Sequence, residues 1–309
     1  MAGEARVSFI ANKMIISWRS FALSLVFAIV AALSSAAEPI DRIIESAVGW
    51  AAWRPVSGEI VMVGLDDRTL GSVPDGRFTR ADHARVIEAV NNAGARRLMV
   101  DFYYQRQEGS EGTSQLAAAV QKMGNRIILA VSTKTVPGTD RLISIFPDPA
   151  ISGPNAQLAS IAWNYQIWQV WNLPLMFDVN GRLLPSVAAA LANKRGDRAT
   201  EFRLDLTYDL STITEYSALD VLEGKVGPRE LAGKDVIFGA TASTLPDQHY
   251  LPGHDLVPGA FIHLIGAEAL KRGNPVNVGW LPAMLISAGG LLFALLTPLE
   301  RRFTWIALG

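Results

Sequence analysis

The sequence predicts an α/β fold with a mixed, largely parallel sheet and helices on both faces, in an extracytoplasmic domain that is flanked by transmembrane helices. Two observations support this prediction. In the middle of the 309 residues, short Val- and Ile-rich runs alternate with amphipathic helical patterns, and this spacing indicates parallel strands joined by right-handed crossovers. At both ends of the chain, by contrast, the residues are apolar and uncharged over long stretches.

The two uncharged stretches have the length of membrane spans. Residues 20–37 and 278–299 each approach the ~20 apolar residues that a helix needs to cross a bilayer. Residues 303–309 resemble the start of a further span that the sequence does not complete. We therefore expect a multi-pass membrane protein, with a folded domain at residues 38–276 between the first two spans.

The basic residues near these stretches set the orientation of the chain. They lie before the first stretch and after the second, at Arg6, Lys13, Arg19, Arg301 and Arg302. By the positive-inside rule, residues 1–19 form a cytoplasmic N-terminus and the central domain is periplasmic or extracellular. Alternatively, the first stretch is a cleaved signal peptide, because the small residues Ser35 and Ala37 precede Glu38. The central domain lies outside the cytoplasm in both cases.

The overall composition excludes several classes of protein. Half of the residues are hydrophobic, 18% are charged and the formal net charge is −1, which excludes an intrinsically disordered chain and leaves no basic surface for nucleic acid. The chain has no Cys, so it has no disulfide framework, no thiolate zinc site and no iron–sulfur cluster. We expect no cofactor.

The first half of the central domain predicts three strands and two helices. One helix is expected to begin after Thr79 or Asp82, either of which can cap it, and to end at about Ala93, before Gly94. A second helix is expected at residues 116–123. The strands are apolar on consecutive positions, as in strands that are covered on both faces. They are expected at residues 58–67, 96–104 and 126–133.

The second half of the domain changes pattern. Residues 159–186 alternate aromatic and polar positions and contain the turn signal Asn180-Gly181, so we expect antiparallel or mixed strands that extend the same sheet. The remaining elements follow the buried-strand and amphipathic-helix patterns. Strands are expected at residues 201–208 and 234–240, and helices at residues 185–195, 217–224 and 258–273.

Four carboxylates lie at or just after the ends of predicted strands and are candidate ligand-binding residues. Asp66 and Asp67 end the first strand, Asp101 lies at the end of the second, and Asp247 comes shortly after the strand at 234–240. Ligands of parallel α/β sheets bind at the carboxyl ends of the strands, so these carboxylates could bind a divalent cation, or could hold a small polar ligand together with Arg77 and Arg80. The alternative is that they cap helices and fix loops through hydrogen bonds to backbone N–H groups.

The histidines have structural interpretations. His249 and His254 lie in an acidic loop and could ligate a metal, but no spacing such as His-Glu-x-x-His accompanies them. We therefore expect solvated or hydrogen-bonded loop residues and no metal. His83 is expected at the surface, and His263 is expected to be half-buried inside an amphipathic helix.

The sequence contains no recognisable catalytic motif. A Gly-x-Ser-x-Gly elbow, a Walker-type loop and a dinucleotide glycine fingerprint are all missing, so no catalytic residue and no enzymatic activity are expected. An aromatic series is expected to serve core and cross-strand packing. This series consists of Trp163, Tyr165, Trp168 and Trp171.

Four segments carry a resemblance to a known family, at residues 60–70, 79–104, 178–188 and 218–270. They resemble the second type of CHASE domain, a sensory extracellular module of bacterial cyclases and histidine kinases. The resemblance covers about residues 38–275, and Asp66, Asp67, Arg80 and Asp101 match the acidic and basic positions of the family. Its most specific positions are Gly239–Thr241, Asp247, Pro252, Pro258, Gly259 and His263.

The chain departs from the family pattern in two respects. Residues 105–116 replace a proline-rich loop that carries an Asp, so the rim of the sheet is expected to differ on that side. Proteins of this family also continue to a cytoplasmic output, such as a nucleotide cyclase, a diguanylate cyclase or phosphodiesterase, or a histidine kinase. We therefore expect a fragment of a larger receptor, with a degenerate remnant as the alternative.

The resemblance implies a membrane-bound sensor module. Its expected partners are the membrane, an unidentified small-molecule or protein signal, and a second copy of the chain. Two alternatives remain open from the sequence. One is a metal-dependent hydrolase that uses the acidic rim, and the other is a non-catalytic interaction domain of the cell envelope.

Overall fold

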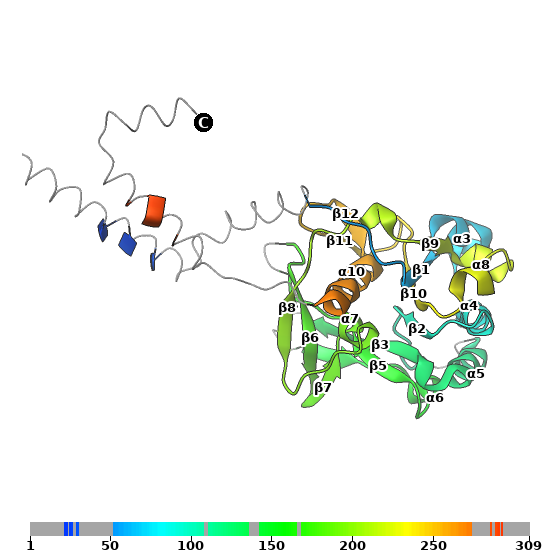
Figure 1. Ribbon diagram of the computed structural model, residues 1–309. Coiled ribbons are helices and arrows are strands. Elements are labelled where there is room, and N and C mark those ends of the chain that lie inside the picture. The colour runs from blue at the N-terminus through cyan, green and yellow to red at the C-terminus, as the bar shows by residue number, and fades with distance from the viewer. Residues whose placement is uncertain are drawn as a thin grey trace, which may run out of the picture. The chain divides into compact units, whose positions relative to one another are not determined.

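The chain divides into two compact units in the computed structural model. One unit consists of Met1–Glu45 and Val276–Gly309, and the other of Ser46–Pro275. The fold below belongs to the second unit (Figure 1). The structure describes residues 52–107, 111–135, 142–165 and 168–273, together with scattered residues near both ends.

Within these described residues, no helix combines the length and the apolar character that crossing a bilayer requires. The segments expected as cytoplasmic N-terminus and membrane spans lie almost entirely outside the described residues. They are residues 1–19, 20–37, 278–299 and 303–309.

A seven-stranded sheet forms the centre of the domain. Its order is β4-β3-β2-β10-β1-β9, and β5 also pairs with β3. Neighbouring strands are parallel, apart from the antiparallel pair β3 and β4. The prediction of a mixed, largely parallel sheet is confirmed. The strands are β1 (Ile60–Leu65), β2 (Arg97–Val100), β3 (Ile127–Thr135), β4 (Leu142–Ile145), β5 (Gln157–Ser160), β9 (Glu215–Ser217) and β10 (Asp235–Ala240).

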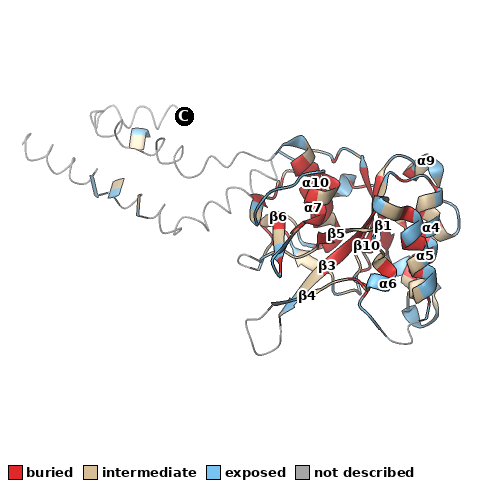
Figure 2. Cartoon of the chain, turned by 90° about the horizontal axis from the view of Figure 1, so that it is seen from below, coloured by how far each residue is buried: buried red, intermediate tan, exposed pale blue. Residues whose placement is uncertain are grey.

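Helices pack on both faces of this sheet (Figure 2). The face that carries α4, α5 and α8 forms one buried cluster, and the face that carries α7 and α10 forms another. The helices are α3 (Asp67–Ser72), α4 (Arg80–Asn92), α5 (Thr113–Met123), α6 (Pro149–Ser152), α7 (Val187–Leu191), α8 (Ala218–Leu222), α9 (Pro228–Leu231) and α10 (Gly259–Arg272), with 3-10 turns η1 (Pro74–Gly76), η2 (Gly124–Arg126) and η3 (Leu210–Thr212).

The strand sequences explain why both faces are covered. Successive side chains of a strand point to opposite faces. In β1, Ile60 and Met62 belong to the cluster with α7 and α10, whereas Val61 and Val63 belong to the cluster with α4 and α5. A strand that is apolar at consecutive positions therefore needs a helical layer on each side.

The signals at the ends of α4 act as expected. The Thr79 side chain accepts a hydrogen bond from the Asp82 N–H, and the Asp82 carboxylate accepts one from the Thr79 N–H, which completes a capping box. Gly94, just past the helix, has φ 79°, in the left-handed region that favours glycine.

The expected extension of the main sheet by residues 159–186 is correct only for β5. The later strands β6 (Asn172–Val179), β7 (Arg182–Pro185) and β8 (Thr200–Arg203) form a separate antiparallel sheet in the order β7-β6-β8. Asn180 and Gly181 make the expected two-residue turn, with φ 55° and 79°. A short hairpin, β11 (Gln248–Tyr250) with β12 (Leu256–Pro258), completes the fold.

Helix α10 lies between the main sheet and the small sheet. A Cβ at Gly266 would be 2.4 Å from Leu173 of β6 and 3.0 Å from Ala188 of α7, so the helix and its neighbours approach closely at this point. Every residue from Ile262 to Leu270 is buried. This enclosure corrects the expectation for His263, which is only 2% exposed rather than half-buried.

The expectation that His83 lies at the surface is also wrong. Its ring lies in an aromatic cluster, with centroids 4.6 Å from Phe102 and 5.3 Å from Phe238. The Tyr104 hydroxyl lies 2.8 Å from His83 Nδ1. Burial lowers the pKa of His83 to about 4, so the ring is neutral at physiological pH.

The aromatic series serves packing only in part. Trp171 is buried in the core, but Trp168 is 85% exposed and Tyr165 is also exposed. Residues 161–165 belong to no strand and Trp168 lies in a turn, so these side chains are not held in cross-strand pairs.

Candidate functional site

The carboxyl ends of β1, β10 and β2 lie at the same edge of the sheet, because these strands are parallel neighbours. The predicted common edge, at which these three strands end, is therefore present. The side chains on it, however, divide into two groups with different roles.

Asp66 and Asp67 hold local structure. Asp66 is the N-cap of α3, and its Oδ1 accepts hydrogen bonds from the Thr69 N–H at 2.8 Å and the Ser217 hydroxyl at 2.9 Å. Asp67 is exposed and accepts bonds from the N–H and hydroxyl of Ser243, at 3.2 and 3.0 Å. Both contacts match the alternative reading of these residues as caps and loop anchors.

Arg80 also lies apart from the other candidates. Its guanidinium donates to the Thr113 hydroxyl at 2.8 Å and to the Gln105 carbonyl at 2.6 Å. These bonds join the start of α4 to the segment after β2 and to the start of α5. Arg80 therefore orients loops in this structure.

Asp101 and Asp247 come together at the start of α10. A Cβ built on Gly239, in β10, would lie 2.9 Å from Ala260 of α10 and 3.6 Å from Asp101 Oδ2. A Cβ on Gly259 would lie 2.7 Å from Asp247 Oδ1. Glycine at these two positions thus lets the strand and helix backbones approach the carboxyl groups.

Two histidines belong to the same cluster. His249 Nε2 lies 2.8 Å from Asp247 Oδ1. His263 lies in the second turn of α10, where the charges of Asp247 and His249 both act on its pKa. Its Nδ1 is buried and has no hydrogen-bond partner among the residues that the structure describes. We call Asp101, Asp247, His249 and His263 the α10 start cluster.

Aromatic side chains border this cluster. The Trp163 ring makes edge contacts with both His249 and His263, at centroid distances of 4.9 and 5.0 Å. The Tyr165 hydroxyl lies 2.5 Å from His249 Nδ1. Since Asp247 and Tyr165 occupy both nitrogens of His249, its ring orientation is fixed from two sides.

Two groups of the cluster are uncharged at neutral pH. Burial, and secondarily the neighbouring charge of Asp247, raise the pKa of Asp101 to about 8 from its usual 3.8, so this carboxyl group is protonated and can donate a hydrogen bond. Burial lowers the pKa of His263 to about 4, so its imidazole is neutral. A protonated carboxyl and a neutral imidazole suit hydrogen bonding to a polar molecule.

A metal is a poor fit to this arrangement. In the described part of the chain, no three His, Asp or Glu side chains converge closely enough to hold an ion. A protonated Asp101 would also have to lose its proton to ligate a cation. The chemistry of the cluster therefore favours a small polar organic ligand.

Sequence reasoning found two of these four residues as candidates and interpreted the other two as structural. Asp101 and Asp247 follow from the rule that ligands bind at the carboxyl ends of strands. A signal for His263 existed, since it is the one imidazole in the helix predicted at residues 258–273 and apolar residues flank it on both sides. In the structure it lies against Trp163, which is in a segment that belongs to no strand.

Comparison with known proteins gives one match. A family model described as "CHASE2 domain" matches residues 22–297, which is most of the chain. No curated protein and no solved structure was found to match the chain.

Proposed function

The chain belongs to the CHASE2 domain family, a family of extracellular sensory domains of receptors, and we propose that its α10 start cluster binds a small polar signal molecule. Binding would shift α10, which leads toward the apolar residues 278–299. The proposal includes a bacterial inner membrane location, spans at 20–37 and 278–299, and a cytoplasmic output. Candidate outputs are a nucleotide cyclase, a diguanylate cyclase or phosphodiesterase, and a histidine kinase.

The buried, unpartnered Nδ1 of His263 is the observation that carries the proposal. A buried polar atom without a partner costs about 1–3 kcal/mol. A ligand that donates to this atom, or accepts from it in the other tautomer, removes that cost. The protonated Asp101 adds a donor beside it, and the carboxyl group of Asp247 adds acceptor oxygens.

Helix α10 is suited to transmit occupancy. Its first turns carry His263 and contact Asp247, and its last turn carries Lys271 and Arg272. Only five residues separate Arg272 from the predicted span at residue 278. A ligand changes the balance between two positions of such a helix only if it binds one position more tightly.

The proposal assigns no reaction to the domain. Two copies of the chain could pair in a receptor of this kind, and paired α10 helices would give the output a symmetric input.

A ligand screen on the full chain tests the proposal. Thermal unfolding in lipid nanodiscs would be measured with a panel of amino acids, polyamines, monosaccharides and dicarboxylates. A compound at 100 times its Kd should stabilise the domain by about 2.7 kcal/mol. The same compound should slow amide hydrogen exchange along Gly259–Arg272.

Substitutions test whether the stabilising compound binds at the α10 start cluster. Asp247→Asn and His263→Gln should remove the stabilisation, because they change the acceptor and the unpartnered nitrogen. Asp67→Asn, on the same edge but outside the cluster, should keep it. Stabilisation that survives both cluster variants, or a bound state with unchanged exchange in α10, would contradict the proposal.

A further inference from the structure

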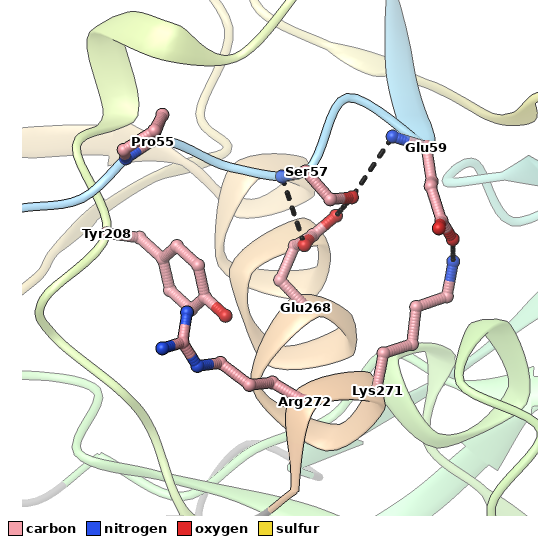
Figure 3. A pocket seen from close by; sticks show the side chains of 7 residues that line it. All are labelled: Pro55, Ser57, Glu59, Tyr208, Glu268, Lys271 and Arg272. Carbon is pink, nitrogen blue, oxygen red and sulfur yellow. Dashed lines mark hydrogen bonds and ion pairs between the residues drawn. The ribbon is translucent and has the colours of Figure 1, made fainter.

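A pocket of about 290 Å³ lies at the other end of α10 (Figure 3). Its wall comes from the segment before β1, from the segment between β8 and η3, and from the last two turns of α10. This size is at the small end of the range for ligand pockets. The lining residues are Pro55, Ser57, Glu59, Tyr208, Glu268, Lys271 and Arg272.

One of the lining groups is a buried carboxylate without a cation. Glu268 is 4% exposed, and its carboxylate accepts hydrogen bonds from the Ser57 N–H at 3.2 Å and the Ser57 hydroxyl at 2.7 Å. Among the described residues, no Lys or Arg nitrogen lies within 4.0 Å of it. Taking a carboxylate out of water costs several kcal/mol unless an opposite charge accompanies it.

The nearest cations do not supply that charge. Lys271 is engaged with other carboxylates, at 3.1 Å from Glu59 and 3.5 Å from Asp235. Arg272 is four residues after Glu268, the spacing at which a helix forms ion pairs. Its guanidinium instead lies beside Tyr208 (Figure 3), and no described carboxylate is within 4.0 Å of it.

The pocket therefore presents one unpaired negative group and one unpaired positive group on adjoining turns of the same helix. Both groups also flank Tyr208, since the charges of Glu268 and Arg272 act in opposite directions on the pKa of its hydroxyl. The hydroxyls of Ser57, which donates to Glu268, and of Tyr208 also line the pocket.

We propose that this pocket binds a small zwitterion that carries a primary ammonium group and an anionic group. The ammonium pairs with Glu268, and the anionic group pairs with Arg272. Two sources have this chemistry, a free α-amino acid and the ethanolamine phosphate headgroup of a phospholipid. The site is separate from the α10 start cluster, so it does not depend on the function proposed for that cluster.

Isothermal titration of the full chain tests the proposal. The chain would be placed in nanodiscs of phosphatidylcholine and phosphatidylglycerol, without ethanolamine lipid, and titrated with glycine, L-alanine, L-serine and phosphoethanolamine. At least one of these should bind, and acetate or methylamine, which carry one charge each, should bind at least about tenfold more weakly.

Charge variants locate the binding. Arg272→Gln and Glu268→Gln should each weaken binding at least about tenfold. Arg85→Gln, which removes a guanidinium that is exposed on α4, is the matched control and should bind as the original chain does. Asp247→Asn should also leave this binding unchanged, which separates it from a ligand at the α10 start cluster.

A second arm distinguishes the two sources. If the headgroup is the ligand, nanodiscs that contain phosphatidylethanolamine should raise the Tm of the original chain but not that of Arg272→Gln, and they should reduce amino acid binding. If a free amino acid is the ligand, the lipid composition should have no effect. Three outcomes would overturn the proposal. Acetate or methylamine could bind as tightly as the zwitterions, Arg272→Gln could bind as the original chain does, or no compound could bind at 10 mM, on the order of a weak Kd.

Discussion

Asp235 and Asp101 lie on neighbouring strands of the sheet, at opposite ends, and their surroundings differ completely. Asp235 begins β10 and is fully buried. Its carboxylate accepts hydrogen bonds from Arg96 at 2.7 and 2.9 Å and from Arg97 at 2.7 and 3.0 Å. Asp101 follows β2, and in the described structure burial and the like charge of Asp247 are the two influences on its pKa.

The two pKa values express this difference. Burial alone would raise the pKa of Asp235, but the hydrogen bonds and charges of Arg96 and Arg97 lower it to about 2. For Asp101, no cation offsets burial, and the pKa rises to about 8. The amino end of the sheet thus neutralises its buried charge internally, whereas the carboxyl end keeps polar groups available for a ligand.

The largest expected effect comes from breaking the internally neutralised end. Asp235→Ala should lower the free energy of unfolding by about 3–5 kcal/mol, because it leaves the guanidinium groups of Arg96 and Arg97 without a buried partner. Urea unfolding of the full chain in detergent micelles, followed by Trp fluorescence, measures this.

Asp220→Ala is the control for this substitution. Asp220 pairs with Arg68 in an ion pair at the surface, so the midpoint of unfolding should stay the same. The contribution of Asp235 should be present above about pH 4 and should be lost as the pH falls toward 2, since its pKa is lowered in the fold. If Asp235→Ala is as stable as the original chain, the ion pairs of Asp235 with Arg96 and Arg97 do not stabilise the amino end of the sheet.

An effect of comparable size over the whole window, with the opposite dependence on pH, is expected at the other end. Between about pH 4 and 8, Asp101 keeps its proton in the fold and loses it on unfolding, so stability should fall as the pH rises through this window. Asp101→Asn removes this loss. Its advantage over the original chain should therefore grow by up to about 1.4 kcal/mol per pH unit and level off above pH 8.

Urea unfolding at several pH values measures the difference between the two proteins. Asp67→Asn, on the same edge but exposed, should leave the pH dependence unchanged. If the free energies of unfolding of the original chain and of Asp101→Asn change in parallel with pH, Asp101 is ionised in the folded protein. The carboxyl end of the sheet would then not hold a protonated carboxyl group.

The parts of the fold that local signals determine were predictable from the sequence. The continuous apolar sequences of β1, β2, β3 and β10 predict strands that are covered on both faces. The Thr79 cap and Gly94 predict where α4 begins and ends. Helix α3 was missed, because it is short and depends on one cap, Asp66, within a segment rich in Gly and Pro.

The parts that depend on distant contacts were not predictable. The small sheet is separate because its strands pack on α10 and α7, as the contact of Gly266 with Leu173 shows. His263 is buried against Trp163, which is in a segment that belongs to no strand. For the α10 start cluster, the rule of strand ends therefore identified Asp101 and Asp247, while the role of His263 required knowledge of which layer covers it.

The smallest expected effect distinguishes the two arginines that neutralise Asp235. Arg96 is half exposed, with 48% of its side chain accessible, whereas Arg97 is 13% exposed. Arg97 also donates to the Ala190 and Leu191 carbonyls at the end of α7, at 2.9 and 2.5 Å, so its loss removes hydrogen bonds to α7 as well as those to Asp235.

Arg96→Ala should therefore cost under about 1 kcal/mol, as is usual for exposed ion pairs, and Arg97→Ala should cost clearly more. The same urea unfolding experiment measures both variants, and 0.5 M salt, roughly enough to shorten the Debye length to half its physiological value, should weaken only the contribution of Arg96. If both variants lose the same free energy of unfolding, the exposure of an arginine does not decide how strongly it stabilises the buried Asp235 carboxylate. The contrast with Asp101 would then depend on the number of cations rather than on their burial.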